Sequence, residues 1–142
     1  MGDELRRIKN FEIDTDFSRV GVSTAGEVQN TLMLHGWPRD RNCWSSFIQA
    51  SAKDRSIVSI DLPGYGQSTW KTEPAPGLEH IQQVSAVIEQ VADALRLENV
   101  HVIGHDRGAR FAHHLVSSNP DWIRHVTLVD IAPSFDVFRV MD

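Results

Sequence analysis

The chain has 142 residues, of which 41% are hydrophobic and 23% charged, and its formal net charge is −5. This balance is typical of a folded globular protein and excludes a disordered chain. The negative charge argues against binding to nucleic acid or to an anionic membrane. The only cysteine is Cys43, so an intramolecular disulfide and a multi-cysteine zinc site are excluded for this sequence. No signal peptide or membrane-spanning run is visible, and we expect a cytoplasmic protein.

The apolar runs predict a sheet whose central strands are buried on both faces. Two short stretches, 11–16 and 19–23, indicate early strands. Four further runs are rich in β-branched residues and lack strict alternation, which is typical of strands covered by helices on both sides. These four runs are 31–34, 56–60, 100–104 and 126–129.

Three segments between these runs predict helices. Apolar residues recur at spacings of three and four from Ile81 to Leu95, which gives one apolar stripe along a helix. A second helix is predicted over 107–118, where Asn119-Pro120 ends it, and a third over 44–52. The alternation of strands and helices predicts an α/β fold with a mostly parallel sheet and helices on both faces.

The most informative motif lies where the run at 100–104 meets the helix at 107–118. Residues 104–108 read Gly-His-Asp-Arg-Gly, which is the layout of a nucleophile elbow, G-x-nucleophile-x-G. Asp106 stands at the nucleophile position and, unlike a serine, is ionised at neutral pH without a base. A carboxylate can attack a saturated carbon and form an alkyl–enzyme ester. The alternative interpretation is an aspartate that only caps the helix.

Two loops ahead of this motif fit the same chemistry. His35-Gly36-Trp37-Pro38 follows the first buried run, and 61–68 forms a Pro- and Gly-rich turn after the second. With such an elbow, one oxyanion N–H comes from the earlier loop and one from the residue after the nucleophile. We therefore expect the backbone N–H groups of Trp37 and Arg107 to form the oxyanion hole. His35 is expected to hold its loop by hydrogen bonds, and His35 and Trp37 are also candidate substrate-binding residues.

Together these motifs resemble the α/β-hydrolases that use an aspartate nucleophile, namely haloalkane and haloacetate dehalogenases and soluble epoxide hydrolases. The elements that carry the resemblance are HGWP with Trp44 downstream, DLPGYGQS, GHDRGAR and LVDIAP, within about residues 11–133. The resemblance is strongest to haloacetate (fluoroacetate) dehalogenases. It implies displacement of halide from a 2-haloacid, a small-molecule substrate, through an alkyl–enzyme ester and without a cofactor.

Two arginines favour the haloacid over an epoxide. Arg107 and Arg110 lie three residues apart in the first helical turn after Asp106, so both can face one side of the site. Guanidiniums bind carboxylates bidentately. The resemblance implies that both arginines hold the substrate carboxylate, whereas many epoxide hydrolases carry Trp directly after the nucleophile. The alternative is that Arg110 points to solvent or pairs with Asp121 or Glu98.

The acid of the predicted triad is assigned by the same resemblance. It places the acid at Asp130, after the run at 126–129, where a carboxylate would orient a base histidine. The alternative is an aspartate that satisfies the turn before Pro133. We expect no metal site, because His101 and His105 would need partners that converge from other elements.

A base histidine should follow the acid in this fold, and no histidine follows Asp130. We therefore expect residues 1–142 to be an incomplete α/β-hydrolase core that lacks the cap and the last strands. The strand at 126–129 would then be a sheet edge open to association, for example in a homodimer. The expected activity is alkylation of Asp106 with at most one turnover. The alternatives are an epoxide hydrolase-like enzyme, or a non-catalytic truncated protein that binds a small anion or a partner.

Overall fold

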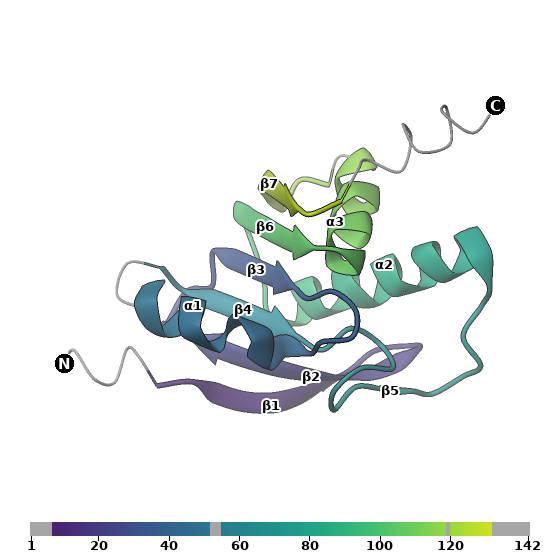
Figure 1. Ribbon diagram of the computed structural model, residues 1–142, viewed down its shortest axis with the longest axis horizontal. Coiled ribbons are helices and arrows are strands. Elements are labelled where there is room, and N and C mark those ends of the chain that lie inside the picture. Colours follow the sequence, from purple (N-terminus) through teal and green to yellow (C-terminus); the bar gives the residue numbers. More distant parts are fainter. Residues whose placement is uncertain (1–6, 52–54, 119, 132–142) are drawn as a thin grey trace.

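The computed structural model of the protein describes residues 7–51, 55–118 and 120–131 (Figure 1). Within these residues, seven strands form one sheet. The strands are β1 (Lys9–Asp14), β2 (Ser18–Ala25), β3 (Thr31–Leu34), β4 (Ile57–Ile60), β5 (Thr69–Trp70), β6 (Val100–His105) and β7 (Ile123–Val129). The helices are α1 (Ser45–Ser51), α2 (Gly77–Ala94) and α3 (Arg107–Ser117), with a short 3₁₀ helix at Arg41–Trp44.

The sheet is mixed, with a parallel half and an antiparallel half. Its order is β1-β2-β4-β3-β6-β7, and β5 pairs with β2. The neighbours β4, β3, β6 and β7 are parallel, as predicted, while β1, β2 and β5 join antiparallel. The two residues of β5 carry no pattern of their own and were not predicted. The carboxyl ends of the parallel strands share one edge, where ligands commonly bind in such sheets.

Two cores lie on opposite faces of the sheet. The larger core contains Leu32 and Leu34 of β3 with buried residues of α2 and α3, and the smaller contains Met33 with Ile48 of α1. Successive residues of a strand point to opposite faces, so β3 is covered on both sides, as its continuous apolar run predicts. Among the described residues, no helix combines the length and the hydrophobicity that crossing a membrane requires.

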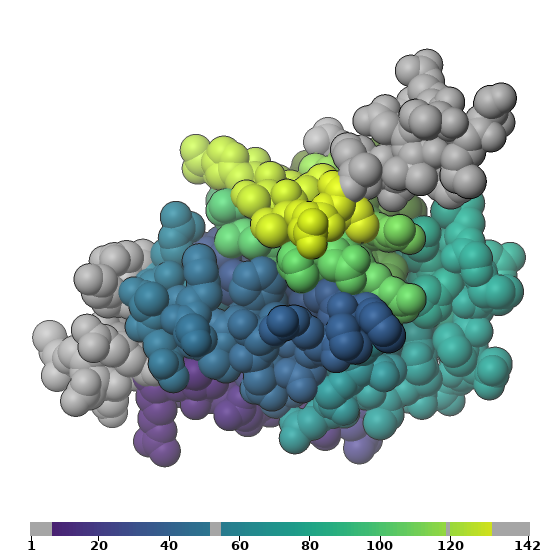
Figure 2. Space-filling view, in the orientation of Figure 1, coloured from purple at the N-terminus to yellow at the C-terminus, as the bar shows by residue number. Residues whose placement is uncertain are grey.

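The prediction of a strand covered on both faces is wrong for β6. Val100 and Val102 are buried against the larger core, but His101 and Ile103 on the other face are only half-buried. The reason is that the buried residues of the smaller core come from β2, β3, β4 and α1, and β6 reaches this core only through the partly buried Ile103. The neighbouring β7 is the last strand on this side of the described sheet and is largely exposed, with Val129 at 41%. Figure 2 shows β7, in yellow, at the molecular surface. The expectation of a sheet edge at this strand is confirmed for the described residues.

A buried ion pair holds together the loops that follow β3 and β4. The Arg41 guanidinium pairs with the Asp61 carboxylate, and the exposed fractions of the two side chains are 6% and 0%. Arg41 also donates from Nε to Ser23 Oγ (2.7 Å) and from Nη2 to Gln67 Oε1 (2.9 Å). Its backbone N–H donates to Asp61 Oδ1 (2.7 Å). These contacts fix both loops relative to β2.

Loss of the Arg41 side chain should destabilise the fold strongly. Replacing Arg41 by Met leaves the Asp61 charge buried without its partner, which costs about 3–5 kcal/mol. The matched control is Arg19→Met, because Arg19 pairs with Asp14 in an exposed position and such pairs contribute little. Urea unfolding followed by tryptophan fluorescence measures both variants. An Arg41→Met midpoint no lower than that of Arg19→Met would contradict this assignment.

Candidate active site

Asp106 occupies a sharp turn between β6 and α3. Its backbone has φ +51° and ψ −116°, a positive-φ conformation that non-glycine residues rarely adopt. The Asp106 N–H donates to the Val129 carbonyl (3.0 Å), and the Asp106 carbonyl accepts from the Ala109 N–H (3.0 Å). Its side chain makes no capping hydrogen bond to α3. The surrounding backbone therefore holds a strained conformation, a feature that clusters at functional sites.

Three glycines allow the chain to pack this closely around the turn. A Cβ atom at Gly104 would lie 2.5 Å from the Gly108 carbonyl oxygen, and one at Gly108 would collide with the Leu34 carbonyl oxygen. At Gly36 a Cβ would lie 2.6 Å from the Cβ of Asp106. The end of β3 and the loop after it thus lie directly against the β6–α3 turn. Side chains larger than hydrogen at these positions would separate them.

The loop after β3 contacts the Asp106 carboxylate directly. The Trp37 N–H donates to Asp106 Oδ2 over 2.9 Å. Burial by itself raises the pKa of Asp106, but the N–H groups of Trp37 and Arg107, together with the charges of His105 and Arg107, more than offset it. The pKa of Asp106 is therefore lower than its ordinary value of 3.8. The carboxylate is therefore ionised at neutral pH. Of the two N–H groups predicted for the oxyanion hole, that of Trp37 forms a hydrogen bond with this carboxylate, and that of Arg107 contributes to its lowered pKa.

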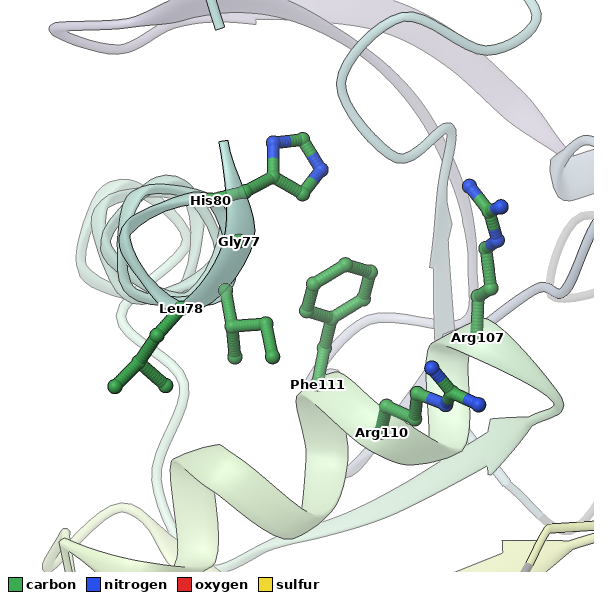
Figure 3. A pocket seen from close by; sticks show the side chains of 7 residues that line it. Gly77, Leu78, His80, Arg107, Arg110 and Phe111 are labelled. Atoms are coloured by element: carbon green, nitrogen blue, oxygen red, sulfur yellow. The ribbon is translucent and has the colours of Figure 1, made fainter. Parts of the chain in front are cut away.

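Arg107 and Arg110 project from α3 along the same side of a cavity (Figure 3). Arg107 Nη1 donates to the Tyr65 hydroxyl (2.8 Å). Among the described residues neither guanidinium forms an ion pair with a carboxylate, so the alternative pairing of Arg110 with Asp121 or Glu98 is not observed. The cavity has a volume of about 440 Å³, and its lining consists of Gly77, Leu78, His80, Ile81, Arg107, Arg110 and Phe111.

His35 lies inside the protein and does not face the cavity. Its side chain has no exposed surface; Nδ1 lies 2.9 Å from the Gly36 carbonyl and Nε2 accepts from the Leu62 N–H (2.9 Å). Because Nε2 is an acceptor, the ring is neutral, and burial lowers the pKa of His35. A side chain this buried cannot contact a substrate in this arrangement. His35 is therefore a positioning residue and not the substrate contact that the sequence predicted. Trp37, by contrast, is 61% exposed and lies beside Asp106.

Asp130 follows β7 at the same edge of the sheet as Asp106. Its side chain is 84% exposed, and Oδ2 lies 3.7 Å from Nε2 of His105, which is 31% exposed. His105 is thus a half-buried neighbour of Asp130. The role of Asp130 as triad acid stays a prediction. The alternative, an aspartate that satisfies the turn before Pro133, involves residues outside the described part of the chain.

Two histidines, His101 of β6 and His125 of β7, contact residues of these two strands. His101 Nε2 lies 2.7 Å from Thr127 Oγ1, and its ring is 6.1 Å from that of His125. In the described ranges, no group of three or more His, Cys, Asp or Glu side chains is arranged to hold a metal ion.

Sequence reasoning missed Tyr65 and the residues of α2 that line the cavity. Tyr65 contacts His35 edge to face, with ring centroids 5.3 Å apart, and its hydroxyl accepts from Arg107. The sequence signal for Tyr65 was its place inside the Pro- and Gly-rich turn at 61–68. For His80 and Leu78 the chain carries no signal, because only the packing of α2 beside α3 brings them to the cavity.

The lowered pKa of Asp106 predicts how this carboxylate titrates. Since the ionised form is favoured in the folded state, its contribution to stability is present above the ordinary value of 3.8 and is lost as the pH falls through the lower folded pKa. A ¹³C NMR titration of the side-chain carboxyls, with Asp106→Asn to assign the signal, measures the midpoint. We expect a midpoint below 3.8. A midpoint above that value would mean that burial outweighs the N–H groups and charges.

A family model described as the alpha/beta hydrolase fold matches residues 32–142. Among curated relatives, a fluoroacetate dehalogenase from Burkholderia sp is 26% identical over 134 residues, covering 92% of this chain and 43% of the relative. A soluble epoxide hydrolase from Corynebacterium sp. (strain C12) is 31% identical over 115 residues, covering 81% of this chain and 39% of the relative.

Solved structures agree on the fold. A Pseudomonas aeruginosa protein, reported as a candidate epoxide hydrolase, superimposes with a TM-score of 0.84 at 26% identity, covering 95% of this chain and 45% of that one. The chain thus spans less than half the length of these relatives. The family match extends over most of the sequence, and the chain belongs to the alpha/beta hydrolase fold family.

Proposed function

We propose that Asp106 is the nucleophile of a hydrolase of the haloacetate dehalogenase type, acting on 2-haloacids. The observation that carries the proposal is an ionised carboxylate at a strained turn, followed in α3 by the guanidiniums of Arg107 and Arg110, which have no carboxylate partner among the described residues. An anionic carboxylate is the natural ligand of such a pair. One relative of this chain is named a fluoroacetate dehalogenase, which fits this substrate class.

In the proposed reaction, Oδ1 of Asp106 attacks C2 of the haloacid. The new C–O bond forms as the carbon–halogen bond breaks, and the halide leaves with the bonding electron pair. The Trp37 N–H holds Oδ2 at 2.9 Å, which leaves Oδ1 to face the substrate. During later hydrolysis of the ester, the same N–H groups would stabilise the oxyanion that forms on the Asp106 carbonyl. Arg107 and Arg110 bind the substrate carboxylate and so orient C2.

Hydrolysis of the ester needs a base that activates water. The resemblance assigns this step to a histidine oriented by Asp130, and no histidine follows Asp130 in this sequence. We therefore propose that these 142 residues complete the alkylation step and release one halide per chain. The chain covers 43% of the fluoroacetate dehalogenase, so the complete cycle is proposed by similarity alone.

A second candidate is an epoxide hydrolase-like activity with the same nucleophile. It is favoured by the soluble epoxide hydrolase that is 31% identical to this chain. In that case Asp106 would open an epoxide ring, and the two arginines would have no carboxylate to bind. The two candidates therefore differ in whether a substrate carboxylate is required.

Incubation with bromoacetate should modify Asp106 once and release one bromide per chain. Bromoacetate also alkylates thiols, so the experiment is done with proteins that carry Cys43→Ser. Burial raises the pKa of the Cys43 thiol and would already slow that reaction. The mass of the intact chain should increase by that of bromoacetic acid minus hydrogen bromide. The isosteric variant Asp106→Asn, whose side chain has the same shape and fits the same turn, should show neither the adduct nor the bromide. Equal modification of both proteins would exclude Asp106 as the nucleophile.

The substrate carboxylate should be required for fast alkylation. Arg110→Gln removes one charged hydrogen-bond donor to the substrate carboxylate. This loss should slow alkylation by bromoacetate about tenfold or more. With the uncharged analogue bromoacetamide the same variant should react as the parent chain does. Because Arg110 is exposed, the substitution should not affect folding. Two results would favour the epoxide hydrolase-like alternative. One is equal rates for both reagents in the parent chain, and the other is alkylation by a simple epoxide that does not depend on Arg110.

A further inference from the structure

The cavity beside the candidate active site is larger than the proposed substrate needs. It lies between the first turn of α2 and the first turn of α3, with a volume of about 440 Å³ (Figure 3). Small-molecule sites commonly measure about 300–1,000 Å³. A two-carbon acid bound at the arginines would leave most of this space empty. The cavity therefore fits a ligand with a longer body.

One side of the cavity is apolar. Phe111 is 7% exposed and belongs to the larger core, and Ile81 packs against that core from α2. Leu78, which also lines the cavity, is 65% exposed. A hydrocarbon chain placed against these three side chains would remove apolar surface from water.

The other side of the cavity carries positive charge. The guanidiniums of Arg107 and Arg110 extend along it, away from Leu78, with Phe111 between the two sides (Figure 3). In the described part of the chain neither has a carboxylate partner, and the Tyr65 hydroxyl holds Arg107 in place. The charge on this wall is therefore available to an anionic headgroup.

His80 completes the wall between the two sides. Its ring centroid lies 5.7 Å from that of Trp70 and 6.4 Å from that of Phe111, so aromatic contacts fix its position. The apolar side itself offers no second cation, which argues against a dicarboxylate. The ligand that matches both sides is an anion at one end and a hydrocarbon along the rest.

We propose that this cavity binds a medium-chain monocarboxylate. Its carboxylate lies between Arg107 and Arg110, where the planar guanidinium fork matches its geometry, and its tail lies along Leu78, Ile81 and Phe111. Since the haloacid carboxylate is assigned to the same arginines, the fatty acid competes with it. Binding does not depend on Asp106 chemistry, and only this competition rests on the proposed function.

Calorimetric titration with acetate, butanoate, hexanoate and octanoate tests the tail site. Each buried methylene should tighten Kd about three- to fourfold, so octanoate should bind at least about tenfold tighter than butanoate. Octan-1-ol, which has the tail without the charge, should bind at least about tenfold more weakly than octanoate. The series is measured on the 142-residue chain and on Asp106→Asn, with the same trend expected. Equal Kd values for butanoate and octanoate would overturn the proposal.

Substitutions at Leu78 locate the tail. Leu78→Asp places a negative charge where the tail is proposed to lie and removes the apolar contact, and should weaken octanoate binding at least about tenfold. Leu78→Asn removes only the contact and should have a smaller effect. The matched control is Val28→Asp, which adds the same charge far from the cavity. Val28 is 78% exposed and lies in the connection before β3, at the opposite edge of the sheet. An effect of Val28→Asp as large as that of Leu78→Asp would overturn the assignment.

Competition separates this proposal from the proposed function. Octanoate should protect Asp106 from bromoacetate at concentrations near its Kd, and acetate at the same concentrations should not. Alkylation without octanoate binding or protection would overturn the cavity proposal and leave the function intact. Octanoate binding without any alkylation of Asp106 would support the cavity and contradict the function.

Discussion

The close approach of two backbone turns is the constraint on which the rest of the site depends. The β6–α3 turn lies against the end of β3 so tightly that Gly36, Gly104 and Gly108 leave no room for a Cβ atom. This contact holds Asp106 at φ +51° and brings its carboxylate to the Trp37 N–H. The strained conformation costs on the order of 1–3 kcal/mol, which the packing around it must offset. An ionised carboxylate is thereby presented at the carboxyl edge of the sheet.

A chain of contacts links the buried core to the groups that would bind an anion. The Arg41–Asp61 pair fixes the turn after β4, His35 accepts from Leu62 in that turn, and Tyr65 from the same turn holds Arg107. The positions of the carboxylate and of one guanidinium therefore depend on the same two loops. A substitution in these loops is expected to displace the Asp106 carboxylate and the Arg107 guanidinium more than the Asp106 backbone, which has its own hydrogen bonds to Val129 and Ala109.

Local sequence patterns predicted the parallel strands and the helix over 107–118, which ends one residue earlier in the structure. Glycine spacing predicted where the chain packs most closely around Asp106 and so where the candidate site lies, because backbone strain and close packing restrict residue type locally. The half-burial of β6 was not predicted, since it depends on how far the helices extend over the sheet. The Tyr65–Arg107 contact joins residues 42 positions apart and has no local signature. The cavity likewise arises only from the packing of α2 beside α3.

The crystal structure of the Cys43→Ser chain after reaction with bromoacetate tests the central claim most directly. The account predicts a carboxymethyl ester on Oδ1 of Asp106, with Oδ2 still bonded to the Trp37 N–H and the new carboxylate facing Arg107 and Arg110. An unmodified Asp106, with the carboxymethyl group on another carboxylate or on a histidine, would contradict it.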